Sequence, residues 1–423
     1  MVDMENLLCK IESRLRDLPV TVALQLPAGR QVGPTGAAVR LSFSDWSSLA
    51  TMATGRIGAM AEDFVECRLQ LEGRMRELMV VAASLLAGTP ASPERRWWLQ
   101  LLRRVRSLQA HSTDRDAEQI EFHYDVSDDF YALWLDPMRV YSCAYYRDAS
   151  LTLAQAQEAK LDHICRKLAL KPGEQFLDIG AGWGALLLWA AKHYGVEATG
   201  VTLSKNQYAY GQQLIESSGM SGRVRMLLCD YRDIDESRTF DKIASVGMFE
   251  HVGHANMATY FDKIYRLLKP GGLVMNHGIT AGGTEHDQLG AGMGDFIEKY
   301  IFPGGELLHV SKVLHAMAGA HLEMVDTENL RPHYARTLWA WSDALEAQLE
   351  QAREVLAADG DLARAEKILR AYRLYLAGSA MSFEQGWISL HQILALRPEA
   401  DDGCNAMRGA RSSYPFNREY AYR

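Results

Sequence analysis

A glycine-rich turn is the first feature of the sequence whose residue types could do chemistry. It reads LDIGAGWG (177–184) and lies between an apolar run and a helical pattern. Glycine at 180 and 182 lets the backbone approach a ligand without a Cβ clash. The turn departs from the dinucleotide pattern GxGxxG, because its third glycine comes one residue early and Asp178 precedes the first.

The form DIGAGWG is similar to the first motif of the S-adenosylmethionine-dependent methyltransferases, whose cofactor has no phosphate. A nicotinamide cofactor and a purely structural turn remain as alternatives. In both cofactor classes the next strand usually ends in an acid that binds ribose hydroxyls. Here that strand ends in VTLSKNQ (201–207), so hydroxyl and amide groups would have to take this role.

The elements around the turn alternate between strands and helices from about residue 112. This order predicts an α/β fold with a doubly wound, Rossmann-like parallel sheet. Residues 335–396 are expected to be mostly helical. The patterns predict helices at 185–195 and 206–219 and strands at 174–180, 196–204, 224–230, 241–247 and 272–280.

Residues 1–88 predict a separate, small α+β domain. Alternating apolar residues flank a Pro/Gly turn at 20–32, as in a hairpin; 66–73 alternates like a half-buried strand, and 75–88 is helical. This domain is similar to the sterol-carrier-like module that precedes some lipid-modifying methyltransferases. The similarity implies a role in lipid binding or dimerisation.

Residues 89–111 are expected to link the two domains through a basic amphipathic helix. The segment ERRWWLQLLRRVRSLQ (94–109) places five arginines among tryptophan, leucine and valine. Such a helix could lie on anionic lipid headgroups, where each basic residue contributes about 1 kcal/mol. It could equally be an interdomain helix with solvated arginines.

Composition excludes several classes of protein. The chain has 423 residues, 48% of them hydrophobic, so a disordered chain or small disulfide scaffold is excluded. Its net charge of −8 without a long basic tract argues against a nucleic-acid partner. Six cysteines without a CxxC pair and an N-terminus without a signal pattern predict a cytoplasmic protein, with no metal site expected. No apolar stretch approaches the ~20 residues of a membrane helix.

Seven segments together resemble the cyclopropane fatty acid synthase family, which includes the mycolic acid cyclopropane synthases. The resemblance covers residues 112–423, the expected catalytic domain. The segments are HYDVSDDFYALWLD with VYSCAYY (123–146), LDIGAGWGA (177–185), GVTLSKNQ (200–207), SVGMFEHVGH (245–254), NHGIT (276–280), KYIFPGGELL (299–308) and LRPHYARTLWAW (330–341). In this family the second strand ends in GVTLS, which accounts for the missing acid.

The resemblance implies a cyclopropane-fatty-acyl-phospholipid synthase. Such an enzyme transfers a methylene group from S-adenosylmethionine to the cis double bond of an unsaturated phospholipid acyl chain, with bound bicarbonate as the base. Histidine and tyrosine side chains can donate hydrogen bonds to an anion, and a carboxylate can accept the bicarbonate proton. The residues that match the family's bicarbonate site are Cys143, Glu250, His277, Ile279 through its backbone, and Tyr334.

The resemblance also implies the cofactor-binding positions. They are Tyr141, Ser142, Gly180, Gly182, Thr202, Leu203, Gln207, Asp230 and Tyr231. Two positions depart from the family pattern: Ala181 and Ser379 stand where many members have cysteine. A serine hydroxyl is a much poorer nucleophile than a thiol, so the chain favours base-assisted chemistry without a covalent enzyme intermediate, or a different product.

Other outcomes within the same fold stay open. The acyl product could carry a methyl or methylene branch, the acceptor could be a small amine, or the chain could be a lipid-binding protein with a vestigial methyltransferase domain. The expected partners are unsaturated phospholipid acyl chains and the inner membrane surface, contacted peripherally, with a homodimer as a further possibility.

The basic segment gives a first testable prediction. Changing Arg95, Arg96, Arg103 and Arg104 together to Glu is expected to weaken binding to anionic liposomes, because four attractive charges become repulsive. Affinity for S-adenosylmethionine should stay the same. Cosedimentation with vesicles measures the effect, and equal binding by variant and parent would exclude a membrane role for this segment.

Overall fold

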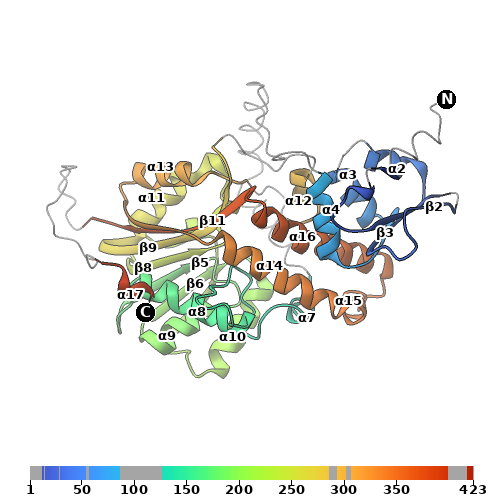
Figure 1. The fold of residues 1–423 in the computed structure, drawn as a ribbon. Helices are drawn as coiled ribbons and strands as arrows, with labels where there is room; N and C mark the ends of the chain where they lie inside the picture. The colour runs from blue at the N-terminus through green and yellow to red at the C-terminus, as the bar shows by residue number, and fades with distance from the viewer. Residues whose placement is uncertain are drawn as a thin grey trace. The chain divides into compact units, whose positions relative to one another are not determined.

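The computed structural model describes residues 12–13, 15–27, 29–53, 57–85, 126–284, 293–301, 306–398 and 417–422. The basic segment 94–109 lies outside these ranges, as do 123–125 and 302–305 of the family motifs. The chain divides into two compact units (Figure 1). The first holds the described residues of Met1–Ser92, Gln288–Pro303 and Leu338–Trp387; the second holds those of Pro93–Asp287, Gly304–Thr337 and Ile388–Arg423.

The first unit is built on a four-stranded sheet in the order β2-β1-β3-β4. The predicted hairpin is confirmed, because β1 (Val22–Gln25) pairs antiparallel with β2 (Gln31–Val32). The predicted strand at 66–73 is confirmed as β4 (Leu69–Glu72), and the helix at 75–88 as α4 (Met75–Leu85). The remaining elements are β3 (Val39–Phe43), α2 (Trp46–Ala53), α3 (Ile57–Val65), α12 (Met293–Tyr300), α15 (Leu349–Leu356) and α16 (Leu362–Glu384).

Two segments expected in the catalytic domain belong to this first unit. These are 288–303 and 338–387, which carry α12, the end of α14 (Arg331–Glu346), α15 and α16. Helix α16 packs on α3 and α4, and α12 packs on α3. Their apolar faces are therefore buried against the N-terminal elements, which are distant in sequence.

The second unit is a seven-stranded sheet in the order β10-β11-β9-β8-β5-β6-β7. The five strands predicted from the sequence are confirmed as a parallel set. Their bounds are β5 (Gln175–Ile179), β6 (Glu197–Thr202), β7 (Val224–Leu228), β8 (Phe240–Val246) and β9 (Leu268–Ala281). The predicted doubly wound α/β sheet is confirmed, and one edge of it is mixed, because β11 (Ile388–Leu396) pairs antiparallel with both β9 and β10 (Glu323–Asn329). The mostly helical pattern of 335–396 thus ends in a strand.

Helices cover both faces of this sheet (Figure 1). Helices α8 (Leu153–Lys167), α9 (Ala185–Tyr194) and α10 (Lys205–Ser217) lie on one face, and α11 (Met257–Leu267) and α13 (Val310–Gly319) lie on the other. Each face of the sheet has its own apolar core, and successive strand residues point alternately into one and the other. Phe176 packs in the core that includes α8 and α9, and Leu177 packs in the core that includes α11 and α13. None of the helices in the described part of the chain is long and apolar enough to cross a membrane.

A buried arginine ties the sheet of the first unit to α16. Arg370 donates to the carbonyl oxygens of Phe64 and Leu69 at 3.0 and 3.2 Å, to Gln70 Oε1 at 2.6 Å and to Glu366 Oε1 at 2.6 Å. Its removal would take one hydrogen bond from each of these acceptors, two of which are carbonyl oxygens of the buried residues Phe64 and Leu69.

We therefore expect Arg370→Met to lower the free energy of unfolding by about 3–5 kcal/mol, the usual cost of breaking a buried ion pair. Arg364→Met on the same helix is the matched control, because its ion pair with Asp359 is half exposed and should contribute less than about 1 kcal/mol. Urea unfolding of both variants measures the difference. Equal losses would show that the buried network does not stabilise the unit.

Candidate functional site

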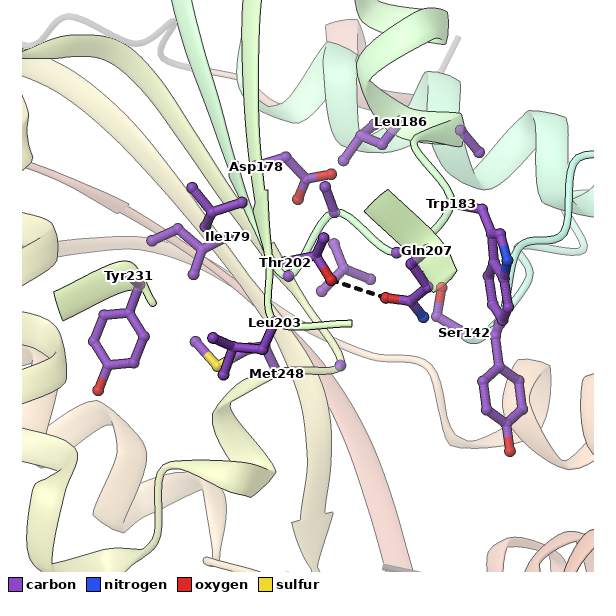
Figure 2. A pocket seen from close by; sticks show the side chains of 18 of the residues that line it. Ser142, Asp178, Ile179, Trp183, Leu186, Thr202, Leu203, Gln207, Tyr231 and Met248 are labelled. Atoms are coloured by element: carbon purple, nitrogen blue, oxygen red, sulfur yellow. Dashed lines mark hydrogen bonds between the residues drawn. The ribbon is translucent and has the colours of Figure 1, made fainter. Parts of the chain in front are cut away.

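A pocket opens at the carboxyl ends of β5, β6 and β8 (Figure 2). Strand β5 lies between β6 and β8. The chain runs from β5 to β6 and β7 on one side and then continues with β8 and β9 on the other side, so the strand order reverses at β5. Ligands of open α/β sheets bind at this switch of strand order. In Figure 2, Trp183 and Tyr231 lie at opposite sides of the view, with Asp178, Thr202 and Gln207 between them.

The glycine turn forms the floor of this pocket. Gly180 has a φ of +81°, a conformation that favours glycine. A Cβ at this position would also lie 3.0 Å from the Cβ of Met248. The amides of Gly180 and Ala181 both donate to the carbonyl oxygen of Val201, at 3.0 and 2.9 Å. The turn is thus fixed to the end of β6.

Hydroxyl and amide groups occupy the end of β6, where other nucleotide sites have an acid. Thr202 Oγ1 donates to the side-chain oxygen Oε1 of Gln207 at 3.0 Å. The side-chain nitrogen Nε2 of Gln207 can then donate to a ligand. Ser204 caps α10 by accepting from the amide of Gln207 at 3.3 Å. Thr202, Leu203 and Gln207 all line the pocket.

The segment Tyr141–Ser142 reaches the pocket because α8 holds it there. Gln157 Nε2 donates to the carbonyl oxygens of Val140 and Ser142, at 3.2 and 2.9 Å. Lys160 Nζ donates to Ser142 Oγ at 3.0 Å. Both side chains come from the buried face of one helix.

The turn after β7 brings Asp230 and Tyr231 to the same pocket. Both carboxylate oxygens of Asp230 already accept from Arg232: Oδ1 from its amide and Nε, each at 2.8 Å, and Oδ2 from Nη2 at 2.7 Å. In this structure Asp230 therefore orders the turn. All nine residues predicted at cofactor-binding positions line this one pocket.

Two buried charges in the pocket were missed from the sequence. Asp178 Oδ1 is buried and has no hydrogen-bond partner within the described ranges. Burial raises the pKa of Asp178 to about 7, although the nearby charge of Lys160 opposes this. Burial also lowers the pKa of Lys160 to about 8, against the attraction of Asp136, Cys143 and Asp178. The position of Asp178 just before the glycine turn was a signal in the sequence for its role. Lys160, a lysine on a helix face, gives no such signal.

Glu250 follows β8 in a short 3-10 helix and turns its carboxyl group toward β9. Its Oε1 accepts from the amide of Ile279 at 2.7 Å, while its Oε2 is buried without a partner in the part of the chain that the structure describes. The approach is close, because a Cβ on Gly278 would lie 2.9 Å from Oε1. Burial raises the pKa of Glu250 to about 7, although the Ile279 amide opposes the rise.

His277 lies two residues before Ile279 on β9 and is fully buried. Its Nδ1 is 3.1 Å from Gln392 Nε2 on β11, and its Nε2 has no hydrogen-bond partner among the described residues. Burial, and after it the charge of Lys160, lowers the pKa of His277 well below its ordinary value. At neutral pH the ring is uncharged.

Cys143 is fully buried, and its thiol lies near two carbonyl oxygens and the side chain of Thr337. Its Sγ lies 3.2 Å from the oxygen of Ala144 and 4.0 Å from that of Leu330, and burial raises the pKa of the thiol above its usual range. It is an uncharged donor and not a thiolate. Tyr334 lies on α14, one helical turn after Leu330, and its backbone amide donates to the carbonyl oxygen of Leu330.

Backbone and side-chain hydrogen bonds connect four of the five residues predicted at the bicarbonate site, Cys143, Glu250, Ile279 and Tyr334, and His277 lies two residues before Ile279 on β9. Leu330, which accepts from Cys143, donates its amide to Leu390, and Leu390 pairs with Ile279 across β11 and β9. Ile279 in turn binds Glu250. Ser379, in contrast, lies on α16 in the first unit.

Comparisons with known proteins agree with this geometry. Residues 111–393 match the mycolic acid cyclopropane synthetase family. The chain belongs to this family. It is therefore an S-adenosylmethionine-dependent methyltransferase, as the sequence predicted.

Three similar proteins illustrate the extent of the match to the family. A probable fatty acid methyltransferase of Pseudomonas putida is 42% identical over 424 residues, covering 99% of this chain and 100% of that protein. Cyclopropane mycolic acid synthase 1 of Mycobacterium tuberculosis is 38% identical over 64% of this chain and 94% of its own. The crystal structure of the mycolic acid cyclopropane synthase CmaA1 complexed with SAH and CTAB has a TM-score of 0.61 at 36% identity, covering 66% of this chain and 98% of that one.

The unpaired carboxylate in the pocket leads to a prediction on cofactor binding. We expect Asp178→Asn to weaken S-adenosylmethionine binding about tenfold to a hundredfold at neutral pH, because a charge-assisted hydrogen bond to the ligand's ammonium group is lost. Asp235→Asn, which changes an exposed carboxylate, is the control. Calorimetric titration measures both affinities.

The pH dependence tests the same role. Asp178 is protonated below its pKa of about 7. The affinity of the unchanged protein should therefore rise between about pH 6 and about pH 7.5, whereas the Asn variant should lack this rise. Identical slopes for both proteins would exclude an ionised Asp178 from cofactor binding.

Proposed function

We propose that the chain is a cyclopropane-fatty-acyl-phospholipid synthase, which adds a methylene group to the cis double bond of an unsaturated phospholipid acyl chain. One observation carries the proposal: Glu250 Oε2 and His277 Nε2 are buried and unpaired within the described residues. Unpaired buried polar atoms are costly, and a bound ligand or ion is one of the explanations for them. Strand β9, which bears His277, pairs with β8, whose end lines the cofactor pocket.

The cofactor pocket suits the methyl donor. S-adenosylmethionine supplies the methyl group, and Asp178 Oδ1 is an unpaired acceptor of the kind that its ammonium group requires. Thr202 and Gln207 offer polar groups to ribose hydroxyls in place of the usual acid. The glycine turn lets the backbone come close to the ligand.

The acyl substrate sets the demands on the rest of the site. An alkene is a weak nucleophile, so the enzyme must hold the reactants together and keep water away. Methyl transfer leaves a cation on the acyl chain, which aromatic faces can stabilise. A base must then remove a proton from the new methyl carbon for the ring to close.

The residues around Glu250 suit a bicarbonate ion as this base. His277 and Tyr334 have N–H and O–H groups that can donate to an anion. Glu250, with its pKa near 7, has both its ionised and protonated forms available to orient the hydroxyl or an oxygen of bicarbonate. The amide of Ile279 already donates to Glu250, so an anion there would share or replace that hydrogen bond.

A methyl- or methylene-branched acyl product is the second candidate. It needs the same methyl transfer, after which the cation, directly or after a 1,2-hydride shift, loses a proton to form a double bond and not a ring. The Pseudomonas putida relative favours it, because that protein is named a probable fatty acid methyltransferase without mention of a ring. Either product requires contact with lipid, and we infer that the chain meets the inner membrane surface peripherally through the segment 94–109.

The product assay separates these candidates. Purified protein would be incubated with S-adenosylmethionine, bicarbonate and vesicles of monounsaturated phospholipid, and the lipids analysed by mass spectrometry and proton NMR. A gain of one CH2 with upfield ring protons is the expected result. Vinyl or branched-methyl signals would show that the product is branched and has no ring. No gain in lipid mass despite tight cofactor binding would contradict an acyl substrate.

The role of Glu250 has its own test. We expect Glu250→Gln to lower turnover at least about a hundredfold, the scale of a lost acid–base contribution, while cofactor affinity stays within about twofold. Glu216→Gln on the exposed side of α10 is the control with the same change of charge. Turnover unchanged by Glu250→Gln would remove this carboxyl group from the chemistry.

A further inference from the structure

The orientation of the Gln392 amide follows from its neighbours. Lys167 Nζ lies 2.9 Å from Gln392 Oε1, and an ammonium group can only donate hydrogen bonds. The oxygen of the amide must therefore face Lys167. Its nitrogen consequently faces His277 Nδ1, at 3.1 Å.

This orientation fixes the tautomer of His277. An amide nitrogen donates, so His277 Nδ1 accepts and carries no proton. A neutral imidazole has one N–H, which must then be on Nε2. That is the nitrogen left buried and unpaired within the described part of the chain.

Lys167 is itself held in place on several sides. Its ammonium also pairs with Glu328 Oε2, which accepts from His163 Nε2 at 2.8 Å. Burial would raise the pKa of Glu328, but the His163 hydrogen bond and the Lys167 charge lower it to about 2. The carboxylate therefore stays ionised, and the ammonium stays next to it.

The ring of Tyr145 supports this arrangement from the side. It stacks on His163 at a centroid distance of 4.1 Å and on His333 at 4.8 Å. The Lys167, Gln392 and His277 side chains are each only about 1% exposed. With so little exposure to water, the amide is held by its two partners, Lys167 and His277.

We propose that Gln392, oriented by Lys167, is a positioning residue that keeps His277 in the Nε2–H tautomer and so makes it a hydrogen-bond donor to an anion in the reaction site. The inference rests on the proposed function. With the other tautomer, Nε2 would present a lone pair to an anion and repel it.

Gln392→Glu is the sharpest variant. A carboxylate accepts from Lys167 and can also accept from His277, so the histidine proton should move to Nδ1. Gln392→Met is the second variant; it has a similar volume but cannot bind either neighbour, so the tautomer preference should weaken without reversing.

Nitrogen NMR of the ligand-free protein with 15N-labelled histidine reads the tautomer directly, because protonated and bare ring nitrogens have separate signals. The His277 signals are assigned by their loss in His277→Asn. We expect Nε2–H in the unchanged protein, Nδ1–H in Gln392→Glu and a mixture in Gln392→Met. The Nε2–H form persisting in Gln392→Glu would overturn the proposal.

Kinetics adds a second readout. Gln392→Glu should raise the KM for bicarbonate and lower turnover about tenfold to a hundredfold, as is typical for residues that orient a ligand-binding histidine. Gln392→Met should have a smaller effect on both, because part of its His277 keeps the Nε2–H form. Affinity for S-adenosylmethionine should not change, which also shows that the variants fold. Unchanged turnover in Gln392→Glu with a shifted tautomer would overturn the catalytic part.

Thr280→Val is the matched control. Thr280 Oγ1 and His391 Nδ1 form a 2.8 Å hydrogen bond between the same two strands. Thr280 lies three residues after His277 on β9, and His391 precedes Gln392 on β11. Its loss should leave the His277 tautomer and turnover unchanged. If the unchanged protein makes no cyclopropane lipid, the proposed function fails, while the NMR result still decides the tautomer.

Discussion

The second unit depends on one physical constraint: the buried face of α8 carries a row of polar side chains beside its apolar residues. Gln157, Lys160, His163 and Lys167 follow one another at spacings of three or four residues, and each is at most 3% exposed. Removing such groups from water is unfavourable unless each finds partners. Their partners are segments of the site: the Tyr141–Ser142 loop, Glu328 of β10 and Gln392 of β11. The helix can therefore be packed only when the site is assembled.

Lys160 connects the electrostatics of the two parts of this site. Its charge opposes the rise in the pKa of Asp178 and contributes to the lowered pKa of His277. Both effects follow from one cation that acts on an acid of the cofactor pocket and on a histidine of β9. The charge state of Lys160 is thereby linked to both, and its own pKa of about 8 is within reach of physiological change.

The sequence predicts those parts of the fold that depend on local patterns. The glycine turn, the strand before it and the helix after it are set by apolar runs and glycine positions, whereas the nine cofactor positions were placed by the resemblance to the family. Strands β10 and β11 were missed because their pairing partners are distant in the chain, and an apolar run such as 388–396 suits a helix as well as a strand. Lys160 and Gln392 were missed because their roles arise only from tertiary contacts.

The unpaired atoms of the site have an energetic consequence for the fold. Asp178 Oδ1, Glu250 Oε2 and His277 Nε2 are each buried without a partner in the described part of the chain, and each such atom costs about 1–3 kcal/mol. A domain of typical stability, about 5–15 kcal/mol, tolerates this only with well-packed cores elsewhere, which the two faces of the sheet provide. Ligands that pair with these atoms bind only the folded state, so they raise the free energy of unfolding and offset the cost of the unpaired atoms. The cofactor, and the bicarbonate ion that we propose, should therefore each stabilise the folded chain, independently of any turnover.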